Sequence, residues 1–139
     1  MDRFEPAPPS PRPRLRVLVA DDSSLSRRIS CLQARKCGVD LEEAADGEEA
    51  VMWMHTAEFD LVLMDVHMPE MNGLEATRLL RSSGFTVPII ATTGSSSNAD
   101  IHECLTAGMS AYLPKPFTQP QLEAILLEHL AWTGAPSLA

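Results

Sequence analysis

Side chains that can do chemistry follow four short apolar runs in this chain. In chain order they are Asp21 and Asp22, Asp65, Thr92 and Thr93, and Lys115. Crowded carboxylates repel one another unless a cation lies between them, and ligand sets made only of oxygen favour a hard ion such as Mg²⁺ or Mn²⁺. A lysine and a hydroxyl beside such a site supply the charge and the donor that a phosphoryl group needs. A carboxylate can itself act as a nucleophile and form an aspartyl phosphate.

Asp65 ends the most informative of these runs. The four large apolar residues of Leu61–Met64 predict a strand buried on both faces, as in a parallel sheet. An acid that closes such a strand lies at the carboxyl edge of the sheet, where open α/β sheets place their ligand sites. A single acid of this kind is commonly only a helix cap. The prediction of a functional site therefore depends on the other polar residues expected at the same edge.

The hydrophobic pattern predicts five strands that alternate with five helices. We expect strands at 15–20, 39–43, 59–65, 87–91 and 110–113, and helices at 23–38, 46–57, 73–80, 97–108 and 119–130. Residues 92–97 are expected to form a loop rich in hydroxyls. This alternation with short connections predicts an α/β fold with a parallel sheet covered on both faces. In the first helix, Leu25, Ile29 and Leu32 recur at i, i+4 and i+7, so this face is expected to pack inward.

Composition and charge exclude several classes of protein. The chain has 139 residues, 45% of them apolar and 22% charged, as expected of one globular domain. Its net charge of −8 argues against broad binding to nucleic acids or to anionic membranes. No apolar run approaches the ~20 residues of a membrane span, and no signal peptide is evident, so a cytoplasmic location is expected. Three scattered cysteines without C-x-x-C spacing predict reduced thiols rather than disulfides or a zinc site.

The ends of the chain differ in composition from its middle. Residues 1–14 carry five prolines and almost nothing to bury, so we expect a disordered tail or a linker there. The folded domain is expected to span 15–132, and residues 133–139 to form a C-terminal tail.

Four segments together resemble the signature blocks of response-regulator receiver domains, the CheY-like family. They read V-L-V-A-D-D-S, L-V-L-M-D-V-H-M-P-E-M-N-G-L-E-A-T-R, P-I-I-A-T-T-G and Y-L-P-K-P, in the order and spacing of the family. The resemblance covers about 15–130 and implies a flavodoxin-like five-stranded sheet of order 2-1-3-4-5.

The resemblance also implies a role for each matching residue. Asp65 would accept the phosphoryl group, and Lys115 would contact its oxygens. Asp22 and Asp65 would bind Mg²⁺ (or Mn²⁺) through their carboxylates, His67 through its backbone carbonyl and Asp21 mainly through water. Thr93 and Tyr112 would form the switch, and the Lys115–Pro116 peptide bond would be cis. No organic cofactor is implied.

A receiver of this kind would take its phosphoryl group from the phosphohistidine of a histidine kinase or a histidine phosphotransfer protein, in a two-component system or a multistep phosphorelay. The added charge would change the surface formed by the fourth helix, the fifth strand and the fifth helix. The resemblance implies no turnover of external substrates, and it is compatible with a weak or phosphorylation-dependent dimer. We also expect His67, two residues after Asp65, to tune the rate at which water removes the phosphoryl group.

Two functions of other classes remain open from the residues. One is a metal-dependent phosphohydrolase, which is disfavoured because Asp65 lacks a D-x-D partner and no substrate cap is inserted. The other is an interaction module with a vestigial acidic site. No DNA-binding, cyclase or kinase segment follows the last expected helix, so output is expected through a partner or through the same pocket. Residues 64–78 resemble receivers of hybrid histidine kinases, and the proline-rich start suits a linker, so we favour a receiver cut from such a kinase. A free-standing regulator and a phosphate sink remain open as alternative roles.

Overall fold

The structure is a computed structural model and describes residues 14–94 and 98–130. The strands are β1 (Arg16–Ala20), β2 (Asp40–Ala44), β3 (Leu61–Asp65), β4 (Ile89–Thr93) and β5 (Ala111–Pro114). The helices are α1 (Ser24–Lys36), α2 (Gly47–Thr56), α3 (Gly73–Ser82), α4 (Asn98–Ala107) and α5 (Gln119–His129). The tails expected at 1–14, apart from Arg14, and at 133–139 lie outside the described residues, as does Ser97, where the fourth helix is expected to begin.

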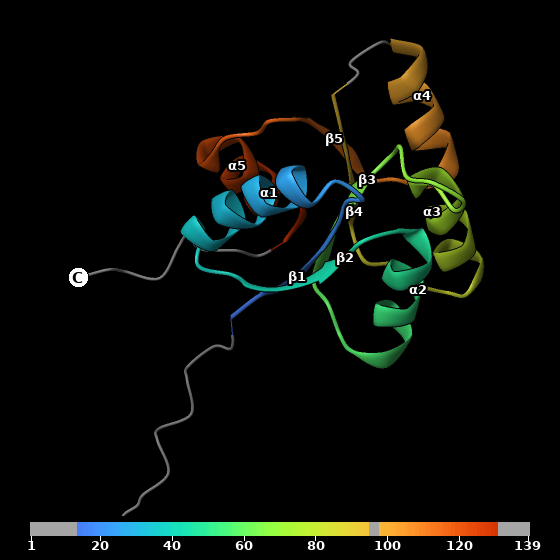
Figure 1. The fold of residues 1–139 in the computed structure, drawn as a ribbon, viewed down its shortest axis with the longest axis horizontal. Helices are drawn as coiled ribbons and strands as arrows, with labels where there is room; N and C mark the ends of the chain where they lie inside the picture. Colours follow the sequence, from blue (N-terminus) through green and yellow to red (C-terminus); the bar gives the residue numbers. More distant parts are fainter. Residues whose placement is uncertain (1–13, 95–97, 131–139) are drawn as a thin grey trace, which may run out of the picture.

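The five strands form one parallel sheet in the order β2-β1-β3-β4-β5, which confirms the predicted α/β fold. Helices α1 and α5 cover one face of the sheet, and α2, α3 and α4 cover the other (Figure 1). Strand β3 lies at the centre, between β1 and β4. A residue at the carboxyl end of β3 therefore has neighbours from both halves of the sheet.

Strand β3 contributes to two hydrophobic cores, one on each face of the sheet. Leu61 and Leu63 pack in the core beneath α1 and α5, while Val62 and Met64 pack in the core beneath α2, α3 and α4. All five residues of β3 are buried, so the predicted strand with two buried faces is confirmed.

The predicted orientation of α1 is wrong. Leu25, Ile29 and Leu32 are 68%, 39% and 52% exposed. The face of α1 that packs on the sheet consists instead of small side chains, with Cys31 and Ala34 both buried. Small residues let the helix lie close to the sheet, and the larger apolar stripe is left on the outer surface.

The predicted loop at 92–97 begins too early. Strand β4 continues through Thr92 and Thr93, because Thr92 pairs with Asp65 of β3 and Thr93 pairs with Pro114 of β5. Threonine is β-branched and suits an extended chain with neighbours on both sides. The rest of this segment, from 95 to 97, lies outside the described residues.

Two further observations concern membrane-spanning helices and the cysteines. Within the described residues, no helix combines the length and the apolar character needed to cross a membrane. The cytoplasmic location stays a prediction. All three cysteines are buried free thiols, and burial raises the pKa of Cys31 and of Cys37 to about 11. Such thiols remain protonated and poorly reactive at neutral pH.

Candidate functional site

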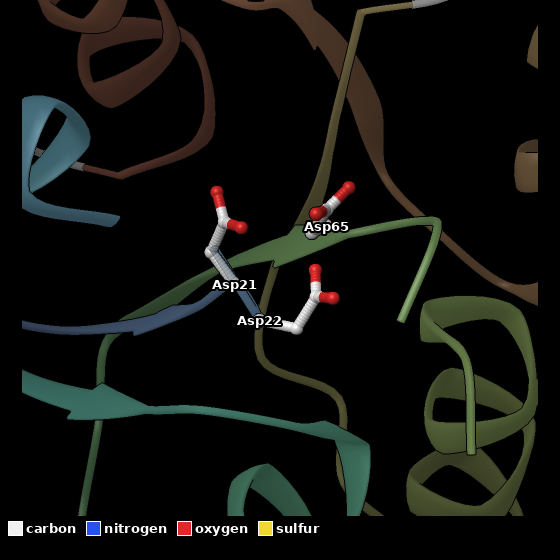
Figure 2. A group of neighbouring side chains, drawn as sticks. All are labelled: Asp21, Asp22 and Asp65. Atoms are coloured by element: carbon white, nitrogen blue, oxygen red, sulfur yellow. The ribbon is translucent and has the colours of Figure 1, made fainter. Parts of the chain in front are cut away.

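Three carboxylates meet at the carboxyl edge of the sheet. Asp21 and Asp22 directly follow β1, and Asp65 is the last residue of the neighbouring strand β3 (Figure 2). One oxygen from each carboxylate lies within 4.8 Å of the other two. Asp21 and Asp65 are buried, whereas Asp22 is exposed and makes no hydrogen bond or ion pair with the rest of the described chain. The predicted acidic cluster is therefore present.

Lys115 reaches this cluster from beyond β5. Its backbone N–H donates to the carbonyl of Thr93, at 3.0 Å, which fixes the start of the side chain beside β4. Its ammonium Nζ then lies 2.9 Å from Asp21 Oδ2, 3.3 Å from Asp65 Oδ2 and 3.0 Å from Ser26 Oγ. The long lysine stem thus carries one positive charge across to the acids of β1 and β3. The following Lys115–Pro116 peptide bond is cis, as predicted.

The loop after β3 packs tightly against the acid that it follows. The backbone N–H of His67 donates to Asp65 Oδ1 at 3.2 Å, while the His67 side chain is exposed. A Cβ at Gly73 would lie only 2.2 Å from the backbone oxygen of Asp65, so glycine is required for this close approach. Gly73 also donates its N–H to the carbonyl of Val66 at 3.0 Å. The carboxylate of Asp65 is therefore held between a rigid strand and a closely packed loop.

The two residues predicted to form the switch lie on neighbouring strands. Thr93 is buried at the end of β4, one residue beyond the position that pairs with Asp65. Tyr112 lies in β5, half-buried, and packs against the core beneath α2, α3 and α4. Both residues thus connect the acidic edge to the half of the sheet near α4.

Burial and hydrogen bonding shift the pKa values of the cluster in different directions. Burial acts to raise the pKa of Asp21, but hydrogen bonds from Ser26, Lys115 and the Ser23 N–H outweigh it and lower this pKa. Burial raises the pKa of Asp65, and the charge of Lys115 only partly offsets this rise. Burial acts to lower the pKa of Lys115, but its contacts with Asp21 and Asp65 raise it. The lysine therefore remains a firmly charged ammonium beside the acids.

Ser26 is the site residue that sequence reasoning missed. It is the third residue of α1, and its hydroxyl donates to Asp21 Oδ2 at 2.5 Å. The signal was present but weak: Ser23 caps α1, so the third residue of the helix lies near the cap and hence near the end of β1.

The donor chemistry of the cluster fits a hard divalent cation. The three acids can carry three negative charges, and Lys115 supplies one positive charge among them. Mg²⁺ prefers ligand sets made only of oxygen. It is commonly held by one or two carboxylates while it keeps several waters. Asp22, with no partner among the described residues, leaves a carboxylate available for such an ion.

Comparisons with known proteins agree with this geometry. Residues 17–127 match the family described as the response regulator receiver domain. The chain belongs to this family. Receiver domains serve two-component and phosphorelay signalling, and phosphorylation on aspartate is characteristic of them.

This receiver domain is similar to proteins of very different length. The two-component response regulator ORR41 of Oryza sativa is 39% identical over 119 residues, which cover 83% of this chain and 94% of that protein. The transcription factor Skn7 of Saccharomyces cerevisiae is 38% identical over 114 residues, 82% of this chain but only 18% of that protein. The chain thus spans about a fifth of the Skn7 proteins that it matches.

A similar solved structure contains a partner. It is the complex of the histidine phosphotransfer protein Ypd1 with the receiver domain of its downstream response regulator Ssk1, both of Saccharomyces cerevisiae. The similarity has a TM-score of 0.76 at 28% identity and covers 86% of this chain and 90% of the matched one.

Proposed function

We propose that Asp65 accepts a phosphoryl group from a phosphohistidine on a partner protein. The observation that carries this proposal is the position of Asp65, which is buried at the end of the central strand with Lys115 Nζ 3.3 Å from its Oδ2. In the step, a carboxylate oxygen of Asp65 attacks phosphorus, a P–O bond forms, and the P–N bond to imidazole breaks. The imidazole leaves with the bonding electrons and takes a proton from solvent.

Mg²⁺ is the cation that we assign to the acidic cluster, and Mn²⁺ also suits it. Asp22 and Asp65 would hold it through their carboxylates, His67 through its backbone carbonyl, and Asp21 mainly through water. When bound, the ion supplies positive charge that neutralises the phosphoryl oxygens during transfer. The nearness of Asp22 to Asp65, with no protein partner of its own among the described residues, supports this assignment.

The other site residues act on the phosphoryl group once it is attached. The Lys115 ammonium offers a point charge to its oxygens, and the Thr93 hydroxyl offers a hydrogen bond. The new group brings about −1.5 to −2 charges, so both side chains are drawn toward it. Movement of Thr93 frees Tyr112 to turn inward, and the surface formed by α4, β5 and α5 changes with it. The placement of Thr93 and Tyr112 on adjacent strands supports this coupling.

The partner is proposed to be a histidine kinase or a histidine phosphotransfer protein, and the Ypd1–Ssk1 complex supports the second class. The outer face of α1 offers it a docking surface beside the acids. That face presents Leu25, Ile29 and Leu32, and the exposed Arg28 and Arg35 lie on the same helix. Because α1 carries no acid while the chain has a net charge of −8, this surface suits a partner with acids around its histidine.

The test of Asp65 uses two matched variants. Asp65→Asn should abolish phosphoryl transfer from acetyl phosphate and from a phosphorylated partner, as followed by intact mass. Asp40→Asn removes an exposed acid from the start of β2, at the opposite edge of the sheet, and should leave transfer unchanged. Retained labelling of Asp65→Asn would refute the assignment. Turnover of a generic phosphomonoester by the unaltered protein would favour a phosphohydrolase instead.

Metal binding can be tested without any phosphodonor. A ligand that binds only the folded state, present at 100 times its Kd, stabilises a protein by about 2.7 kcal/mol. Saturating Mg²⁺ should therefore raise the melting temperature of the unaltered chain, and a chelator should reverse the effect. Asp22→Asn should weaken the response because it removes a carboxylate that has no other role in the described chain. An equal Mg²⁺ response in Asp22→Asn would contradict the proposed ligand set.

A further inference from the structure

Ser26 bridges the two charged groups that flank the proposed phosphoacceptor. Its hydroxyl donates to Asp21 Oδ2 at 2.5 Å and accepts from Lys115 Nζ at 3.0 Å. The ammonium of Lys115 has three donors and finds three oxygen acceptors, on Ser26, Asp21 and Asp65. We propose that Ser26 is a positioning residue, which holds Lys115 and Asp21 in the geometry required for phosphoryl transfer to Asp65. This inference rests on the proposed function of Asp65.

The first turn of α1 makes Ser26 a rigid support. Ser23 caps the helix, and its Oγ accepts from the Ser26 N–H at 3.2 Å. The Ser23 N–H in turn donates to Asp21 Oδ1 at 3.0 Å. Each oxygen of the Asp21 carboxylate is therefore bonded to the same helical turn, Oδ1 through Ser23 and Oδ2 through Ser26. The contacts with Asp21 and Ser26 thereby fix the Lys115 ammonium relative to the start of α1, although the four-carbon stem of lysine is flexible.

The hydroxyl of Ser26 is not needed to form the helix. Capping of α1 is already provided by Ser23, and both hydrogen bonds of the Ser26 hydroxyl go to charged side chains outside the helix. A serine used only as a helix residue would place its hydroxyl in solvent or on the backbone. The contacts of Ser26 thus point to a role in the site.

Lys115 needs an acceptor that stays in place during the reaction. When a phosphoryl group is attached to Asp65, the contact between Lys115 and that carboxylate is exchanged for contacts with phosphoryl oxygens. Asp21 and Ser26 are the two acceptors that remain unchanged. Without Ser26, the ammonium would have a single fixed partner, and more of its orientational freedom would be lost when transfer occurs.

The kinetic test compares variants within the first turn of α1. Ser26→Ala should lower the saturating rate of phosphorylation by acetyl phosphate about tenfold or more, since hydrogen bonds to charged groups are the stronger class. Ser26→Thr keeps the hydroxyl and should retain most of the rate. Ser24→Ala removes an exposed hydroxyl from the same turn and should have no effect. A wild-type rate in Ser26→Ala, or an equal loss in Ser26→Thr, would overturn the inference.

A second readout follows Lys115 directly in the unphosphorylated protein. The chain contains only two lysines, Lys36 and Lys115, so ¹⁵N labelling of lysine gives two ammonium signals, and Lys36→Arg assigns them. Lys36 is exposed, so its ammonium protons are expected to exchange rapidly with water. The Lys115 signal should be sharp in the unaltered chain, broadened in Ser26→Ala and restored in Ser26→Thr. An unchanged Lys115 signal in Ser26→Ala would show that Ser26 does not position the lysine.

The two readouts separate failure of this inference from failure of the proposed function. If the unaltered chain accepts no phosphoryl group, the function of Asp65 is refuted, and the ammonium signals still show whether Ser26 holds Lys115. If the chain is phosphorylated and Ser26→Ala behaves as the unaltered chain in both readouts, only the role of Ser26 is refuted. Thermal melts of Ser26→Ala and Ser24→Ala confirm that both variants are folded before the rates are compared.

Discussion

Strand β3 and helix α1 both border the acidic cluster, yet they use their apolar residues in opposite ways. All five residues of β3 are buried, and they supply both cores. The largest apolar side chains of α1 instead point outward, with Leu25 68% exposed and Leu32 52% exposed. The strand therefore contributes stability and rigid support for Asp65, whereas the outer face of α1 is available to a partner.

The difference shows what an apolar pattern does and does not specify. A continuous apolar run in the middle of a parallel sheet has no outer face, so burial of β3 follows directly from its sequence. A helix that carries one apolar stripe and one stripe of small residues can place either against the sheet. In α1 the small residues, such as Cys31 and Ala34, lie inward. The exposed apolar stripe beside the acids is the surface that we propose for partner docking.

The largest expected effect is on stability. Leu63→Ala removes a fully packed side chain of β3 and should lower the free energy of unfolding by about 2–5 kcal/mol. Leu32→Ala, the same substitution on the outer face of α1, should change it by no more than about 0.5 kcal/mol. Urea unfolding of both variants measures the difference. Equal destabilisation would mean that Leu32 is part of a core, and the contrast between the two elements would fail.

Leu32 should matter for phosphoryl transfer from a partner, although it should contribute little to stability. Leu32→Ala should slow transfer from a phosphorylated partner about tenfold, or roughly 1.4 kcal/mol, through the loss of an interface contact. Transfer from acetyl phosphate, which needs no docking surface, should be unaffected. Leu79→Ala is the matched control, because Leu79 is an exposed leucine of α3 on the opposite face of the sheet. A similar loss with acetyl phosphate would place the effect of Leu32 in the acidic site instead of the interface.

The sequence predicted the parts of the site that depend on local patterns. Asp65 ends a continuous apolar run and Lys115 directly follows the last expected strand, so the sequence alone predicts both at the carboxyl edge of the sheet. For Ser26 the only local signal is the helix cap at Ser23, and its contact with Lys115 joins positions 89 residues apart. The strand pairing that extends β4 through Thr93 is likewise tertiary. The orientation of α1 was missed because its two stripes have the same period.

Asp65, which ends β3, and Asp21, which lies between β1 and α1, should respond oppositely to pH in the metal-free protein. The pKa of Asp65 is raised above the ordinary 3.8. Its favourable contribution to the free energy of unfolding is therefore fully present below pH 3.8 and is lost as the pH rises through its pKa in the folded protein. The pKa of Asp21 is lowered. Its favourable contribution to the free energy of unfolding is therefore present above pH 3.8 and is lost as the pH falls through its pKa in the folded protein. At neutral pH, Asp65→Asn should raise the free energy of unfolding, whereas Asp21→Asn should lower it.

Urea unfolding at neutral pH, and again below the unfolded carboxyl pKa of 3.8, tests both signs. The stabilisation by Asp65→Asn should shrink on acidification, because both forms are then neutral at that position. Lys115 keeps Asp21 and Ser26 as acceptors in this variant, so no unpaired ammonium is created. The same sign for both substitutions at neutral pH would contradict the assigned pKa directions.

The smallest effect is expected at His67, where β3 passes into its loop. Its backbone N–H is bonded to Asp65 Oδ1, but its side chain is exposed and free to overhang the phosphoryl group. His67→Ala should therefore alter the half-life of phosphorylated Asp65 by a few-fold, less than the tenfold that corresponds to about 1.4 kcal/mol in the barrier. His102→Ala, an exposed histidine of α4, is the control. Decay of the acyl phosphate is followed by intact mass after the donor is removed. Because the substitution leaves the backbone bond to Asp65 intact, a changed half-life reports on the side chain alone, and an unchanged one refutes its role in hydrolysis.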